Sequence, residues 1–229
     1  MIVDMEKVLL TFGDSWPQGG ELRQGQRPYG ELIKEQLGFT HFTNYGSAGA
    51  SNEDMLYQLQ RFLQSIATHA TGNTSITAIF HLTNPSRTIH WPPNTNWDME
   101  SKECQDWPES ARRQMKKLFL HFNNTDQEIM RSSTTVTALQ AWCKLYQIDD
   151  YYFSGWIKYN KWLPGLDLTK IWKQGLETAA DWFGAKEFNS EHLLNVAKNP
   201  YITPNFAHPN QQGHQLIADN LSAWIKLKQ

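Results

Sequence analysis

The chain has 229 residues, two cysteines, a formal net charge of −2 and an isoelectric point near 6.4. This length fits one α/β domain with insertions and is enough to bury a substantial core. The small net charge gives no electrostatic reason to expect a nucleic acid or an anionic membrane as the main partner. Cys104 and Cys143 form no C-x-x-C pair, which argues against a zinc knuckle or a disulfide-stapled scaffold, so free thiols are expected.

The N-terminal segment lacks the charge order of a signal peptide, because the acidic residues Asp4 and Glu6 precede its apolar run. No stretch approaches the roughly 18 consecutive apolar residues of a membrane span. The sequence therefore predicts a soluble protein that is cytoplasmic or carried in a virion, and it leaves the oligomeric state open.

The N-terminal half alternates predicted strands with predicted helices. Lys7–Gly13 is predicted to be a buried parallel strand because its apolar residues run nearly unbroken. Apolar positions at helical spacing predict helices over Tyr29–Leu37 and Glu53–Ile66. A short strand is predicted between these helices over Phe39–Tyr45, and the strongest strand signal in the chain is Ser75–Thr83.

The C-terminal half contains two predicted insertions, around residues 86–124 and 155–200. Ile89–Pro108 has three Trp and three Pro without a clear period, which predicts an ordered surface loop. The apolar period between Gly155 and Asn199 favours mainly helical structure. The remaining predicted elements are a helix over Thr125–Tyr146, a strand over Gln147–Phe153 and a terminal helix over Gln211–Lys226.

Strands that alternate with helices imply parallel β-α-β crossovers. The predicted fold is thus an α/β, three-layer α/β/α sandwich around a parallel sheet of four or five strands, formed by residues 1–229 as a single domain. Ligands of open α/β sheets bind at the carboxyl ends of the strands. Ser15, Gly46–Gly49 and Asn84 all fall at such ends.

The candidate chemistry is acyl transfer, which needs a nucleophile, a base in hydrogen-bond reach and donors aimed at the developing oxyanion. Ser15 follows the first strand, and His208 lies in a Pro-containing turn before the last helix. In isolation, Ser15 could equally be a helix N-cap. For His208 the alternative is a turn histidine bonded to backbone. His214 lacks the i, i+4 spacing of paired metal ligands on a helix and is predicted to be structural.

Four segments resemble, in order, the four sequence blocks of the GDSL or SGNH hydrolases: FGDSWPQG, NYGSAGAS, LTNP and NFAHPN. The resemblance implies that Ser15 is the nucleophile and that His208 is the base. It also implies an oxyanion hole formed by Ser15, Gly49 and Asn84. The family has a flavodoxin-like sandwich and hydrolyses esters, thioesters or acetylated sugars without a metal. The resemblance therefore implies neither a metal nor a cofactor.

Two blocks depart from the family pattern. The third, usually G-x-N-D, keeps Asn84 but has Leu82 and Pro85 in place of the flanking Gly and Asp. The fourth, usually D-x-x-H-P, keeps His208 but has Asn205 in the place of the acid. An amide can orient the imidazole ring, whereas only a carboxylate also stabilises the imidazolium by its charge.

The leading hypothesis is a serine esterase that acts on a small acyl group. The expected substrate is an acetyl ester of a carbohydrate, because Trp-rich insertions can stack on sugar rings. Its expected partner is a small-molecule or carbohydrate ester. One alternative is a non-catalytic carbohydrate-binding or structural protein on the same fold. A second alternative is a lipase or lysophospholipase with an acyl groove lined by Trp91, Trp97 and Trp107.

Overall fold

A parallel sheet forms the middle layer of the protein. The computed structural model describes residues 6–67, 74–85, 125–155, 157–159, 161–183, 199–203 and 208–228. Within them, four strands pair in parallel in the order β2-β1-β3-β4, which is the flavodoxin-like order. The strands are β1 (Glu6–Phe12), β2 (His41–Asn44), β3 (Thr74–Leu82) and β4 (Ile148–Ser154).

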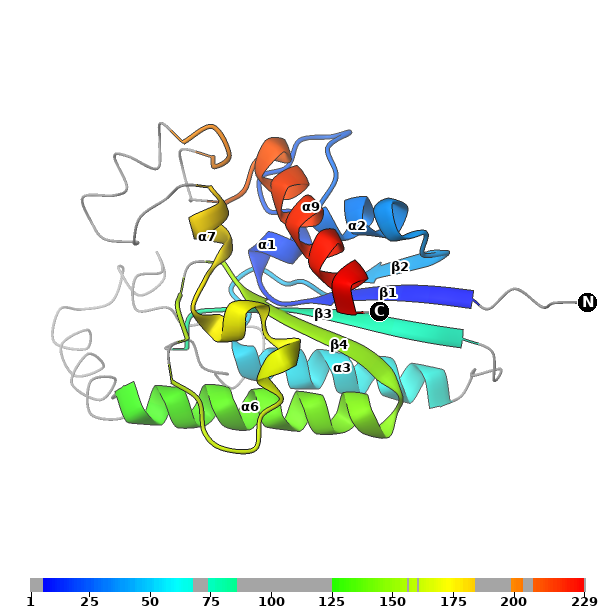
Figure 1. Cartoon of the computed structure of the whole chain (residues 1–229). Coiled ribbons are helices and arrows are strands. Elements are labelled where there is room, and N and C mark those ends of the chain that lie inside the picture. The colour runs from blue at the N-terminus through cyan, green and yellow to red at the C-terminus, as the bar shows by residue number, and fades with distance from the viewer. Residues whose placement is uncertain are drawn as a thin grey trace, which may run out of the picture.

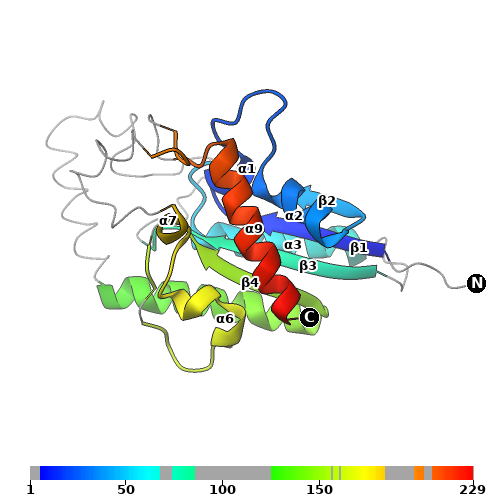
Figure 2. The ribbon, with the colours of Figure 1, turned by 45° about the horizontal axis from the view of Figure 1, so that its top comes forward.

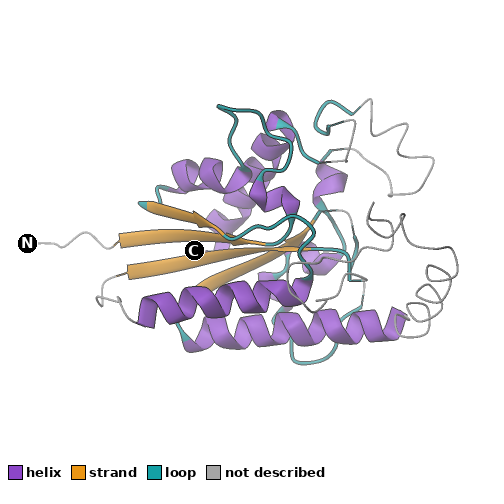
Figure 3. Ribbon diagram, turned by 180° about the vertical axis from the view of Figure 1, so that it is seen from behind, coloured by secondary structure: helices purple, strands orange, loops and turns teal. Residues whose placement is uncertain are grey.

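Helices cover both faces of this sheet, which gives three layers (Figure 1). α2 (Tyr29–Leu37) and α9 (Gln211–Lys228) pack on one face. α3 (Asn52–Ala67) and α6 (Thr125–Leu145) run side by side on the other, as the view from behind in Figure 3 also shows. The predicted α/β/α sandwich is confirmed, with four strands in the part of the chain that the structure describes.

Neighbouring residues of the central strand β1 face opposite layers. Leu9 packs in the cluster that contains Ile33 of α2, whereas Leu10 packs in the cluster that contains Met55 of α3. All four side chains are fully buried. A strand that is covered on both faces needs apolar residues at successive positions, which explains the unbroken apolar run in the sequence.

The periodic elements agree well with their predicted bounds. The helix predicted over Tyr29–Leu37 has these limits in the structure, and every other predicted strand and main helix begins and ends within two residues of its prediction. These segments are the ones in which a single apolar period extends over the whole element, so local pattern and tertiary packing agree.

The prediction of mainly helical structure between Gly155 and Asn199 is wrong for the residues that the structure describes. Most of the described part of this segment is irregular, with short single turns in place of long helices. The turns are η1 (Leu168–Lys170), η2 (Trp172–Gly175) and α7 (Ala179–Trp182).

Backbone geometry and aromatic packing explain this difference. Lys173 and Gln174 have φ values of +44° and +56°, which a helix does not allow. Two apolar residues of this segment pack on each other instead of lining a helix face, since the rings of Trp172 and Trp182 lie edge to face with centroids 5.0 Å apart. An apolar period can therefore arise from separate core contacts of an irregular chain.

Several other predictions concern residues that the structure describes only in part. The predicted loop Ile89–Pro108 and Cys104 lie outside the described residues. Cys143 is free and buried, and burial raises the pKa of its thiol.

Among the described residues, no helix is long and apolar enough to cross a membrane, and no cluster of three or more His, Cys, Asp or Glu side chains could hold a metal ion. The single-domain organisation stays a prediction.

His214 on α9 is fully buried and connects this helix to α2. The backbone N–H of Tyr29 donates to His214 Nδ1 at 3.2 Å, and the two rings stack with centroids 5.9 Å apart. Burial, with smaller contributions from His208 and His81, lowers the pKa of His214 to about 3. These contacts give His214 the structural role that the sequence predicted.

We expect the free energy of unfolding to decrease as the pH falls below about 6.5, the ordinary pKa of histidine. The pKa of His214 is lower in the folded protein, so the unfolded chain takes up the proton first. The stabilisation that the neutral ring contributes is present above pH ~6.5 and is lost as the pH falls toward the folded pKa. From pH 6.5 to pH 5 the loss should be about 2 kcal/mol.

Urea unfolding at pH 7 and pH 5 measures this loss. His214→Gln should be less stable at pH 7 but should lose less stability on acidification. The solvent-exposed His41→Gln serves as the control and should follow the wild type. If the free energy of unfolding of His214→Gln decreases between pH 7 and pH 5 as much as that of the wild type, His214 is not the group responsible.

Candidate active site

Three of the predicted site residues lie at one edge of the sheet, where the parallel strands end. Ser15 follows β1, Gly49 follows β2 and Asn84 follows β3. Because these strands are neighbours in the sheet, their carboxyl ends share an edge. His208 comes from the far end of the chain, immediately before α9, and Figure 2 shows the beginning of α9 beside α1 at this edge.

Ser15 is the first residue of the short helix α1 (Ser15–Gln18). The Asp14 carboxylate caps this helix, since its Oδ1 accepts the backbone N–H of Trp16 at 3.0 Å. Gly13 allows the chain to turn here: it has φ +137°, and a Cβ at this position would lie only 2.8 Å from the carbonyl oxygen of His81. A buried serine is thus held directly after a central strand.

The decisive contact joins Ser15 to His208. Ser15 Oγ lies 2.8 Å from His208 Nε2, a hydrogen-bond distance. The other ring nitrogen, Nδ1, lies 3.5 Å from Oε2 of Glu21. The backbone of His208 is fixed as well, because the N–H of Thr203 donates to its carbonyl at 2.8 Å. A hydroxyl and an imidazole in this arrangement can act as a nucleophile and its general base.

A buried histidine that the sequence analysis did not single out supports the turn around Ser15. His81 Nδ1 on β3 lies 3.1 Å from Asp14 Oδ1, and the His81 ring stacks on Trp16 with centroids 5.2 Å apart. The side chain that caps α1 is therefore held from the sheet as well. The only signal in the sequence was a histidine within the otherwise apolar run SITAIFHLT.

The segment that carries Asn84 is held by two side chains from other elements. Asn52 Oδ1 accepts the backbone N–H of Thr83 at 2.8 Å, and the hydroxyl of Tyr159 donates to the Thr83 carbonyl. Asn52 Nδ2 also lies 2.9 Å from the Tyr159 hydroxyl. Asn84 itself is exposed and follows this fixed segment of backbone.

Gly49 lies in the turn after β2 with φ +75°, a conformation that favours glycine. The same turn is tied to the start of the site, because the N–H of Ser47 donates to the carbonyl of Gly13 at 3.0 Å. The structure thus brings Ser15 and His208 into contact and places Gly49 and Asn84 at the adjoining strand ends. Asn205 lies outside the described residues.

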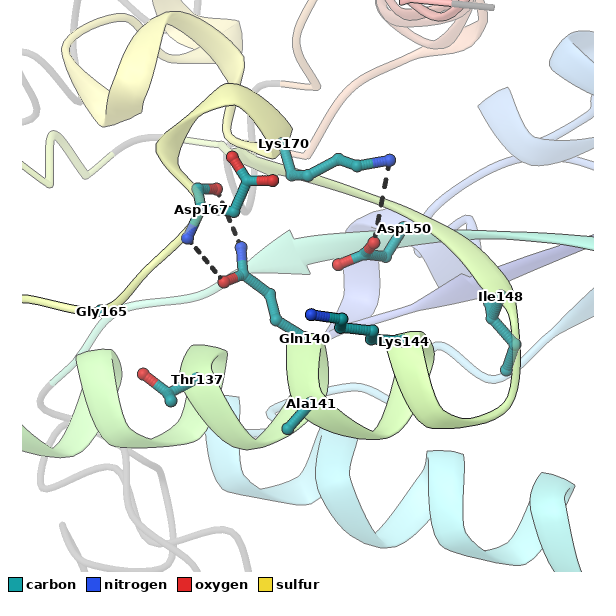
Figure 4. Close-up of a pocket in the computed structure, with 9 residues that line it drawn as sticks. All are labelled: Thr137, Gln140, Ala141, Lys144, Ile148, Asp150, Gly165, Asp167 and Lys170. Carbon is teal, nitrogen blue, oxygen red and sulfur yellow. Dashed lines mark hydrogen bonds and ion pairs between the residues drawn. The ribbon is translucent and has the colours of Figure 1, made fainter.

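A pocket of about 450 Å³ lies between α6 and the segment around Asp167, and no predicted site residue lines it. Figure 4 shows Lys170 reaching toward Asp150, with Nζ 4.0 Å from Oδ1. Burial raises the pKa of the Asp150 carboxyl. Gln140 closes one wall, since its amide exchanges two hydrogen bonds with the backbone of Asp167. This pocket is separate from the contact between Ser15 and His208.

Neither a protein-family model nor a curated protein sequence matches the chain, but solved structures do. A member of the lipolytic G-D-S-L family from Veillonella parvula is 18% identical, with 93% of this chain and 94% of that chain covered and a TM-score of 0.40. A catalytic mutant of the acetylxylan esterase Axe2 from Geobacillus stearothermophilus is 16% identical, with 98% and 96% covered and a TM-score of 0.48. The psychrotrophic esterase EstA from Pseudoalteromonas sp. is 14% identical, with 96% of each chain covered and a TM-score of 0.47.

Proposed function

We propose that the protein is a serine esterase that hydrolyses small acyl esters, with acetyl esters of carbohydrates as its substrate class. The observation that carries this proposal is the 2.8 Å contact between Ser15 Oγ and His208 Nε2. A serine that only caps a helix uses its hydroxyl on backbone N–H groups of that helix. Here the cap is Asp14, so the hydroxyl of Ser15 is left to the histidine.

The proposed reaction has two halves. In the first, Ser15 Oγ attacks the ester carbonyl carbon while His208 Nε2 takes the hydroxyl proton, and the carbonyl electron pair moves onto oxygen. The tetrahedral intermediate collapses, and the departing alcohol takes the proton back from His208. In the second half, water attacks the acyl-serine with the same proton transfers, which releases the acid and restores Ser15.

The proposed oxyanion hole consists of the backbone N–H groups of Ser15 and Gly49 and the side-chain amide of Asn84. Support comes from their placement at the ends of three adjacent strands, with the Asn84 segment fixed by Asn52 and Tyr159. Donors that are held in place before the reaction stabilise the developing charge without reorganisation.

The proposed carbohydrate specificity rests on the sequence alone. Trp91, Trp97 and Trp107 can supply flat surfaces for sugar rings, and they lie outside the described residues. The same residues would line an acyl groove in the lipase alternative. Comparing p-nitrophenyl acetate with p-nitrophenyl octanoate separates the two, because a lipase turns over the longer ester at least as well.

We expect Ser15→Ala to lower kcat for p-nitrophenyl acetate by more than about 10³-fold, since the nucleophile is lost. The melting temperature should stay close to that of the wild type because only a hydroxyl is removed. Ser65→Ala on α3 is the matched control and should keep full activity. Activity within about tenfold of the wild type in Ser15→Ala would contradict the assignment of the nucleophile. No turnover by the wild type would favour the non-catalytic alternative.

We expect Asn84→Ala to lower kcat by about 10²–10³-fold with little change in KM, because an oxyanion donor acts mainly in the transition state. Steady-state kinetics with p-nitrophenyl acetate measures both constants. A rise in KM with an unchanged kcat would instead show that Asn84 binds the substrate.

A further inference from the structure

A carboxylate lies near the ring nitrogen of His208 that does not face Ser15. His208 Nε2 faces Ser15 Oγ at 2.8 Å, and Glu21 Oε2 lies 3.5 Å from His208 Nδ1. The hydroxyl and the carboxylate therefore lie near different nitrogens of the same imidazole ring. The side chains of His208 and Glu21 are only 20% and 22% exposed. Water therefore screens the electrostatic interaction between the two side chains less than it would at the surface.

The backbone around Glu21 folds back toward the serine. The N–H of Gly20 donates to the carbonyl of Ser15 at 2.8 Å. A Cβ at Gly20 would lie 3.3 Å from Ser15 Cβ and 3.6 Å from His208 Cε1, so this turn packs against both residues. Glu21 has φ +68°, a region that residues with a Cβ adopt at a free-energy cost. Such a conformation persists where the surroundings hold it, and it often marks a functional position.

Thr203 connects the carboxylate to the histidine. Its hydroxyl donates to Glu21 Oε2, and its backbone N–H donates to the His208 carbonyl at 2.8 Å. The position of the Glu21 carboxylate is thus fixed relative to the backbone of His208. The charge of His208 also interacts with His214, which burial keeps neutral at ordinary pH.

We propose that Glu21 is the positioning carboxylate of His208, in the role that the family pattern gives to an acid at the place of Asn205. Glu21 accepts the Nδ1–H of His208, which leaves Nε2 unprotonated toward Ser15, and it stabilises the imidazolium that forms when the serine attacks. The distance of 3.5 Å shortens as that charge develops, since catalytic hydrogen bonds are often long before the substrate binds. This inference rests on the proposed esterase function.

Glu21→Gln should lower kcat for p-nitrophenyl acetate by about 10–10³-fold, less than the loss of a fully buried acid, because Glu21 is partly exposed. Glu21→Asp keeps the charge and should recover part of this loss. Glu35→Gln removes an exposed carboxylate that pairs with Arg27 and should leave kcat unchanged. Because Glu21→Gln removes a negative charge beside the imidazolium, the acidic limb of the pH profile of kcat/KM should move to lower pH in this variant.

A second measurement does not depend on turnover. Long-range ¹H–¹⁵N NMR spectra of the histidine rings distinguish a proton on Nδ1 from one on Nε2. When the ring is neutral, His208 should carry its proton on Nδ1 in the wild type. Glu21→Gln should yield a mixture of both tautomers. Thr203→Val should shift the tautomer in the same direction, which keeps the test available if Glu21→Gln does not fold.

The outcomes separate this inference from the proposed function. If the wild type hydrolyses esters and Glu21→Gln changes neither kcat, the acidic limb nor the tautomer, the role of Glu21 is refuted. If Asn205→Ala changes the tautomer and Glu21→Gln does not, the amide orients the ring instead. If the tautomer responds to Glu21→Gln but the wild type has no esterase activity, the contact between Glu21 and His208 stands and the esterase proposal fails.

Discussion

The contact between Ser15 and His208 bridges 193 positions of the chain, and the proposed chemistry depends on it. It forms only when the first strand lies in the middle of the sheet and the last helix packs on α2. The hydrogen bond from Tyr29 to the buried ring of His214 fixes the beginning of α9, directly after the turn that carries His208. The two reacting groups are therefore positioned by the same packing that stabilises the fold, so a change in the core can alter the site from a distance.

Much of this arrangement could be predicted from the sequence. The strands around Leu9 and Ile79 are apolar at successive positions because helices cover both faces of the sheet, and that pattern is local. Parallel order then places Ser15 and Asn84 at one edge without knowledge of any contact. His208 stands out in the sequence because it lies in a Pro-containing turn before an amphipathic helix. A nucleophilic serine requires a base, and this connects His208 to Ser15.

The remaining features could not be predicted because they depend on contacts between distant residues. Glu21 follows two glycines in a polar stretch, and its approach to His208 requires a positive φ that no sequence rule assigns to glutamate. His81 looked like part of an apolar strand, although its ring meets Asp14 in the core. The error between Gly155 and Asn199 has a related cause, because Trp172 and Trp182 pack on each other in an irregular chain.

The most direct test of the account is covalent labelling by a fluorophosphonate, which reacts with serines that a neighbouring base activates. The labelled protein would be digested and the modified residue located by mass spectrometry. The account predicts one phosphonylated residue, Ser15, with labelling that slows markedly in His208→Ala and stops after heat denaturation. Absence of labelling, or a label on a different serine, would contradict the claim that Ser15 and His208 form a catalytic pair.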